Sequence, residues 1–313
     1  MLAFLTVLPI FGLIFAGWAV RRLGALGEGA LTELNRFVVY LALPALLFDV
    51  VVTARPAEIW QPGFFAAFFL GCAAVFAVAA LASLWRRRGL ADVAIAGLNA
   101  GYANTGFMGF PVALAALGPG AQAPALLAVL ATVSGVFAVA LVMVEIAAQR
   151  AGTGKGALAL NVIKSLAKNP LITAPVLGGL MLALGLHLPQ PAERMLSMLG
   201  AAASPCALIC LGLFLAEKRE AHAADRAATA ALSLMKVVVH PAITWLLASY
   251  VFRLSTPLVH AAVLLSALPT GTGPFMIAEF YKRDATVTAR VVLVTTVLSV
   301  ATLTALIAGM SGI

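Results

Sequence analysis

The sequence predicts an all-α integral membrane protein with ten transmembrane helices, arranged as two inverted repeats of five helices. Three observations support this prediction. Of the 313 residues, 63% are hydrophobic and only 10% are charged, whereas about 25% of the residues in a soluble domain are charged. The apolar residues form ten long stretches. The basic residues gather in alternate loops between these stretches, with 17 of the 20 Lys and Arg residues on one side.

Each apolar stretch is close to the roughly 20 residues that a helix needs to cross a bilayer. Such a segment must be helical, because lipid offers no hydrogen-bond partners to an open backbone. The expected segments are residues 2–20, 32–52, 61–85, 90–117, 122–148, 169–187, 194–216, 231–252, 257–281 and 286–311.

The loop charges predict the orientation of the chain. Only Arg55, Arg194 and Arg253 lie on the side that is poor in basic residues. Basic loops stay in the cytoplasm, so we expect the odd-numbered loops there and both termini outside. This bias also accounts for the net charge of +8. We therefore expect contact with membrane lipids and none with nucleic acid.

The longest polar connection in the middle of the chain divides it into two halves. Residues 150–168 form this predicted cytoplasmic linker, between a first half at 1–149 and a second at 169–313. Each half holds five apolar segments. Five is odd, so the second half must enter the membrane upside down relative to the first. This inverted-repeat layout is typical of secondary transporters.

Two apolar segments are interrupted by Gly and Pro at corresponding places in the two halves. Free backbone groups at such breaks must face protein, water or a ligand, and paired breaks indicate a transport site. A half-helix that begins at a break presents its positive N-terminal end, which favours an anion. The carbonyl ends of the other half-helices could hold a cation. The predicted substrate-binding residues are Asn99, Asn104, Thr105, Gly106, Pro269, Thr270, Gly271, Thr272, Gly273 and Pro274.

The sequence predicts no metal site, no cofactor and no catalytic residues. Its three cysteines lie in apolar stretches, and it lacks a His-Glu-x-x-His pair. His240 is the only ionisable residue expected deep in a segment, either as a neutral buried side chain whose ring is hydrogen-bonded to a carbonyl or as a proton relay. We expect Lys236 to extend to the membrane surface. The predicted function is a secondary transporter that moves a small organic anion by alternating access. The alternative functions are a channel-like anion pore and a membrane-embedded enzyme. The residues do not distinguish sodium from a proton as the coupling cation.

Three motifs resemble the auxin efflux carrier (PIN-like) family, including bacterial members often called malonate transporters. They are Leu34-Asn35-Arg36-Phe37 followed by Leu43-Pro44, Asn104-Thr105 with Met108-Gly109-Phe110-Pro111, and Ala267-Leu268-Pro269-Thr270-Gly271 with Pro274-Phe275. The resemblance spans essentially the whole chain.

The resemblance implies that segments 4 and 9 cross, with segments 1, 2, 6 and 7 as a scaffold and 3–5 with 8–10 as the moving transport domain. It further implies a homodimer in a bacterial inner (plasma) membrane. Asn104, helped by the backbone at Gly273, would contact the carboxylate of a malonate-like mono- or dicarboxylate. The sequence departs from the plant pattern at Ala103 and Leu47 and has no Asp or Lys at 61–85. The resemblance therefore does not imply auxin as the substrate.

Overall fold

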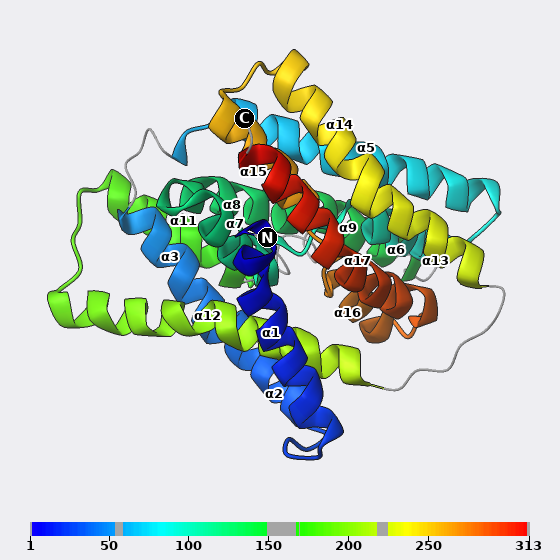
Figure 1. Ribbon diagram of the computed structural model, residues 1–313, viewed down its shortest axis with the longest axis horizontal. Coiled ribbons are helices and arrows are strands. Elements are labelled where there is room, and N and C mark those ends of the chain that lie inside the picture. Colours follow the sequence, from blue (N-terminus) through cyan, green and yellow to red (C-terminus); the bar gives the residue numbers. More distant parts are fainter. Residues whose placement is uncertain (1, 54–58, 149–166, 169, 218–224, 312–313) are drawn as a thin grey trace.

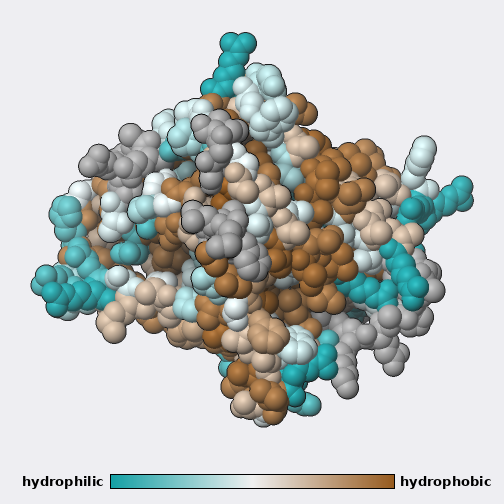
Figure 2. All heavy atoms as spheres, in the orientation of Figure 1, coloured by the Kyte–Doolittle hydropathy of each residue, from teal (hydrophilic) through white to brown (hydrophobic). Residues whose placement is uncertain are grey.

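The computed structural model describes residues 2–53, 59–148, 167–168, 170–217 and 225–311. Over these residues the protein is built from helices, with a single isolated β-bridge between Ala103 and Thr270. Broad apolar areas cover the face in Figure 2, and hydrophilic side chains gather at its margins. Six helices in this part of the chain are long and apolar enough to cross a membrane: Ala30–Thr53, Pro62–Trp85, Pro119–Ala148, Gln190–Ala216, Arg226–Val251 and Thr286–Met310.

The first half of the chain holds α1 (Leu2–Arg22), α2 (Ala30–Phe37), α3 (Leu43–Thr53), α5 (Pro62–Trp85), α6 (Leu90–Gly101), α7 (Phe110–Leu117), α8 (Gln122–Leu130) and α9 (Ala138–Ala148). The second half holds α11 (Pro170–Ala183), α12 (Gln190–Ala216), α13 (Asp225–Leu234), α14 (His240–Leu246), α15 (Thr256–Ser266), α16 (Gly273–Phe280) and α17 (Thr286–Ser311). π-helical turns join α2 to α3, α8 to α9 and α13 to α14 into continuous spans.

The two segments expected to be interrupted are both split in the structure. The first break lies at 102–104, between α6 and the π-helical turn Thr105–Gly109 that leads into α7. The second lies at 267–272, between α15 and α16. Pro111 does not itself break the chain, because it occupies the first turn of α7, where proline is tolerated.

Segment 169–187 forms a shorter helix than expected. α11 has 14 residues, which makes it about 21 Å long, whereas the hydrocarbon core is about 30 Å thick. The number of ten spans therefore stays a prediction. The predicted linker at 150–168 lies, apart from 167–168, outside the described residues.

The helices pack in two groups. α1, α2, α3, α11 and α12 contact one another, and the second group consists of α5–α9 and α13–α17. Figure 1 shows α1 lying across α12 on one side and α14 beside α5 on the other. The groups meet where α1 contacts α7 and α17, where α3 contacts α8, and where α12 contacts the turn that precedes α7.

Glycines let α1 and α12 approach closely. A Cβ added to Gly17 would overlap the backbone carbonyl of Ile209, and one added to Gly212 would overlap that of Ile14. Small residues allow this backbone contact between membrane helices, where van der Waals packing drives association. These two glycines therefore hold the first group together.

Polar contacts tie the ends of helices in the second group. Arg283 binds Asp92 at the start of α6 through two hydrogen bonds, of 3.0 and 2.6 Å. This carboxylate raises the pKa of Arg283. The Tyr281 hydroxyl donates a hydrogen bond to Glu145 of α9. Burial, followed by this contact with Glu145, raises the pKa of Tyr281. The end of α16 is thereby attached to both α6 and α9.

Candidate functional site

The two breaks lie against each other and complete each other's hydrogen bonding. The backbone N–H of Asn104 donates to the Pro269 carbonyl at 2.8 Å, and that of Gly271 donates to the Tyr102 carbonyl at 3.1 Å. Between these bonds, Ala103 and Thr270 form the antiparallel bridge. Backbone groups freed by the breaks are thus paired inside the protein, which a membrane interior requires. We call this region the crossing, defined as 102–105 and 267–273.

Four helix ends meet at the crossing. α6 and α15 arrive with their C-terminal carbonyls, while the helical turn at Thr105 and α16 at Gly273 begin there. The first turn of a helix has N–H groups without partners in the helix, and it carries about half a positive charge. The crossing therefore presents two positive and two negative helix ends within one small region.

Asn104 lies at the start of the second half-helix with its side chain buried at 3% exposure. Among the described residues, its side-chain Nδ2 has no hydrogen-bond partner. A buried donor without a partner costs about 1–3 kcal/mol, so this amide is suited to bind a ligand. Two residues further on, a Cβ added to Gly106 would meet no atom within 4 Å. There is thus space beside the first turn of this half-helix.

Asn99 and Thr270 connect the crossing to α17. The Asn99 side chain donates to the Thr288 hydroxyl at 3.0 Å. The Thr270 hydroxyl donates to the Asn99 carbonyl at 2.8 Å, and the Thr270 N–H donates to the Thr295 hydroxyl at 3.1 Å. Asn99 Oδ1 has no hydrogen-bond partner among the described residues. The Asn99 Nδ2 and carbonyl and both Thr270 groups are paired inside the protein, so Asn99 and Thr270 support the crossing from behind.

The hydroxyl of Thr105 is also used inside the protein. It lies 2.7 Å from the Thr132 hydroxyl, which donates to the carbonyls of its own helix, at Ala128 and Val129. The Thr105 backbone N–H donates to the Ala103 carbonyl at 2.8 Å. Both the hydroxyl and the N–H of Thr105 are therefore paired inside the protein. Thr272 and Gly106 are half-buried, whereas Pro269, Gly273 and Pro274 are buried.

The sequence analysis missed Tyr102. Its ring packs against both glycines of the second break: an added Cβ would lie 2.8 Å from Tyr102 Cε1 at Gly271, and 2.9 Å from it at Gly273. Its other neighbour is Phe137, with ring centroids 5.7 Å apart. The two glycines therefore leave room for an aromatic ring. The only signal in the sequence was an aromatic residue two positions before Asn104.

The structure contradicts the expectation that Lys236 reaches the membrane surface. Its helix begins at Asp225 rather than at 231, so the residue lies deeper than expected and has 0% exposure. Lys236 Nζ lies 3.1 Å from His240 Nδ1. The expectation that His240 is buried is confirmed, at 0% exposure, but Nδ1 contacts a lysine rather than a carbonyl.

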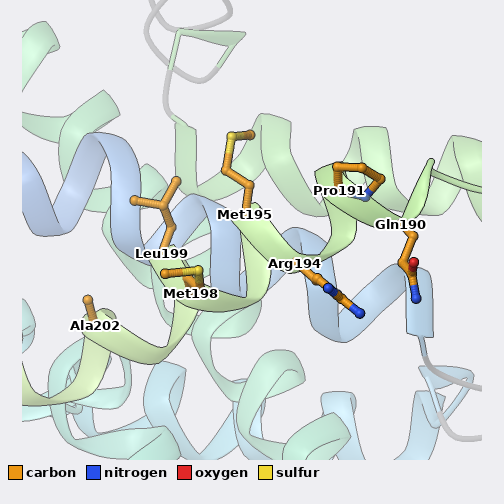
Figure 3. Close-up of a pocket in the computed structure, with 7 residues that line it drawn as sticks. All are labelled: Gln190, Pro191, Arg194, Met195, Met198, Leu199 and Ala202. Atoms are coloured by element: carbon orange, nitrogen blue, oxygen red, sulfur yellow. The ribbon is translucent and has the colours of Figure 1, made fainter.

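Other hollows lie away from the crossing. Figure 3 shows one along α12, of about 640 Å³, lined by Gln190, Pro191, Arg194, Met195, Met198, Leu199 and Ala202. A single helix supplies all these residues, so the hollow is an open surface. Helix ends and an unpartnered amide make the crossing the better candidate. Within the described part of the chain, no group of three His, Cys, Asp or Glu side chains could hold a metal ion.

The chain is a multi-pass helical protein in which two broken helices meet at a polar crossing. This architecture is typical of membrane transporters. The sequence matches the family described as membrane transport protein over residues 2–307. The chain belongs to this family, that of the PIN-like auxin efflux carriers.

Its relatives are named as transporters. A protein of Rhizobium meliloti named "Putative malonate transporter" is 34% identical over 302 residues, which cover 96% of this chain and 93% of that protein. "Uncharacterized transporter YfdV" of Escherichia coli is 25% identical over 285 residues, 87% of this chain and 86% of that protein. "Auxin efflux carrier component 8" of Arabidopsis thaliana is 30% identical over 126 residues, 39% of this chain and 34% of the carrier. The chain is therefore a membrane transporter and not an enzyme.

Proposed function

We propose that this transporter is a secondary carrier that moves a small organic anion, a mono- or dicarboxylate such as malonate, by alternating access. The observation that carries the proposal is the buried Nδ2 of Asn104, which has no partner among the described residues and stands at the positive end of a half-helix. A carboxylate accepts hydrogen bonds and carries the charge that this end favours.

We propose two roles for the expected site residues. Asn104 Nδ2 and the backbone at Gly106, Thr272 and Gly273 would contact the anion. The remaining expected residues, Asn99, Thr105, Pro269, Thr270, Gly271 and Pro274, would shape and support the crossing. The name of the Rhizobium meliloti relative supports malonate as the first substrate to test.

The packing supports alternating access between two bodies. The crossing belongs entirely to the second group of helices, which would move as the transport domain. The first group, with α1, α3, α11 and α12, would be the scaffold. α12 contacts the turn Thr105–Gly109, which supports a scaffold that borders the proposed site. Movement of the second group against α12 would expose the anion to one side at a time.

The test of this proposal compares ligands that differ only in charge. Purified transporter should bind malonate, and the neutral malonamide should bind at least tenfold more weakly, because helix ends favour a negative charge. Proteoliposomes should take up malonate with saturable kinetics. Equal affinity for the acid and its amide would exclude an anion site, and flux that rises linearly with concentration would favour a pore.

We further propose that residues 1–149 and 169–313 are inverted repeats, in a bacterial inner membrane with both termini outside. The matched places of the two breaks support this arrangement. Single cysteines at Arg88 and Ser255, both exposed, should label from opposite sides of the membrane in a background without native cysteines. Labelling of both from the same side would overturn the inverted topology.

We also propose that the protein is a homodimer that pairs through the scaffold. The support is an exposed apolar face, formed on α11 by Val176, Leu177, Leu180 and Leu184 and on α12 by Met195 and Met198. A Leu180→Cys variant should form a disulfide-linked dimer in membranes, whereas Leu81→Cys, equally apolar and exposed on α5, should not. Monomers alone in both variants would leave this face to lipid.

A further inference from the structure

Lys236 is a buried ionisable residue directly behind the crossing. It lies in the π-helical turn Met235–Val239 that joins α13 to α14, and its side chain is fully buried. Lysine is almost never fully buried without a partner. The partners of this side chain and its charge therefore bear on how the transporter works.

The lysine is bound to the end of a broken helix. Its Nζ donates to the carbonyl of Ser266 at 2.6 Å, and Ser266 is the last residue of α15. That carbonyl belongs to the negative end of the half-helix, which favours a cation. Three residues further along the chain, the Pro269 carbonyl accepts the N–H of Asn104. Lys236 and the proposed anion site thus lie on either side of one short segment.

No carboxylate neutralises Lys236 within the described residues. The groups that face it are the imidazole of His240 and the thiol of Cys72 on α5, which is itself buried. Other charged residues lie on the helices that pack against its turn. Asp92 of α6 is engaged by Arg283, while Arg226 of α13 and Arg290 of α17 are themselves cations.

The contacts of Lys236 can be kept in two protonation states. As an ammonium, Nζ donates to Ser266 and to a His240 ring whose Nδ1 accepts. As a neutral amine, Nζ still donates to Ser266 and accepts from a His240 tautomer that carries its proton on Nδ1. A buried ammonium without a counter-ion is strongly disfavoured. An anion at the crossing would supply the missing negative charge.

We propose that Lys236, hydrogen-bonded to His240, is the proton-binding site of this transporter, and that it takes up one proton when the anion binds at the crossing. The coupling rests on the proposed function. The proton comes from water on the side that the site faces, bonds to the Nζ lone pair, and returns to water on the other side when the anion leaves. For a monoanion the pair moves no net charge.

The first experiment needs no substrate. In protein labelled with ¹³C at lysine Cε, the NMR signal that is missing from Lys236→Gln identifies Lys236. This signal should shift between pH 5 and pH 9 as the amine titrates. A Lys236 signal that is constant over this range would overturn the proton site.

The second experiment measures coupling. Calorimetric titration of malonate in two buffers that differ in ionisation enthalpy counts the protons taken up. The wild-type protein should take up about half a proton per malonate at the midpoint of that titration and about one proton above it. Above the midpoint, affinity should fall by up to tenfold per pH unit, as linkage requires. Lys236→Arg, which is always charged, should bind malonate without proton uptake, and Lys282→Gln should behave as wild type.

The outcomes separate the two proposals. Binding without proton uptake in the wild type, or unchanged uptake in Lys236→Arg, would overturn the coupling. If malonate and other carboxylates do not bind at any pH while the Lys236 signal titrates, the anion carrier proposal falls and the proton site stands.

Discussion

Replacing Asn104 tests the proposed anion site most directly. Its Nδ2 has no partner in the described structure, so removing the amide breaks no hydrogen bond of the unliganded protein. It removes one charge-assisted bond to a carboxylate, worth about 1.5–3 kcal/mol. Asn104→Ala should therefore weaken malonate binding by roughly ten- to a hundredfold. Stability should change little, because the backbone bonds of Asn104 at the crossing remain.

The isosteric Asn104→Asp variant makes the test sharper. Its carboxylate would occupy the same positive helix end and repel an anion about 4 Å away by about 4 kcal/mol at the effective dielectric constant of a protein. Malonate binding should then fall well below that of the Ala variant. The assay is equilibrium binding to purified protein, with uptake at matched expression.

Two asparagines serve as controls. Asn99→Ala removes the bond to Thr288, so it should lower the melting temperature more than the affinity. Asn35→Ala, on α2 away from the crossing, should leave malonate binding unchanged. Full affinity in both Asn104 variants would refute the reasoning and leave only the backbone to hold the anion.

The remaining predictions concern packing and pH. Gly271→Ala should reduce transport at unchanged expression, because its Cβ would lie 2.8 Å from the Tyr102 ring and shift the crossing; unaltered uptake would contradict this. Gly212→Ala should destabilise the fold by about 1–3 kcal/mol by separating α1 from α12, as measured by thermal unfolding in detergent. The pKa of Tyr281 is raised above its unfolded value near 10.0, so its bond to Glu145 contributes its full stabilisation below pH 10. This stabilisation is lost as the pH rises from that value through the pKa of the folded protein. Wild type should thus lose stability faster than Tyr281→Phe above pH 10, and parallel unfolding curves for the two would contradict the assignment.

Local sequence signals predicted the helices and both breaks. Runs such as 61–85 and 286–311 are apolar over the length of a membrane span, and the structure has helices at Pro62–Trp85 and Thr286–Ser311. The motif around Asn104 placed one interruption where the structure has it, at 102–104. Pro111 does not mark this break, because it lies in the first turn of α7, and the sequence does not show whether a proline breaks a helix or occupies its first turn.

The depth of a charged side chain in the membrane was predicted less well than the positions of the apolar segments. Lys236 was expected near the surface because the helix was expected to begin at 231, and six further residues of helix place it in the interior. Helix ends are the least reliable part of a prediction from sequence. At the start of this helix, that shift changed a surface lysine into a buried one.

The sequence by itself determined the membrane environment, the helical fold and the positions of the two breaks, because these depend on residues adjacent in the chain. Only the tertiary structure decided which polar groups are left for a ligand. Thr105 and Thr270 carry hydroxyls of the kind that bind ligands, but these hydroxyls are hydrogen-bonded to Thr132 and to the Asn99 carbonyl. Asn104 keeps an unpaired donor. The partners that occupy these two hydroxyls lie 27 and 171 residues away in the chain, which local patterns do not encode.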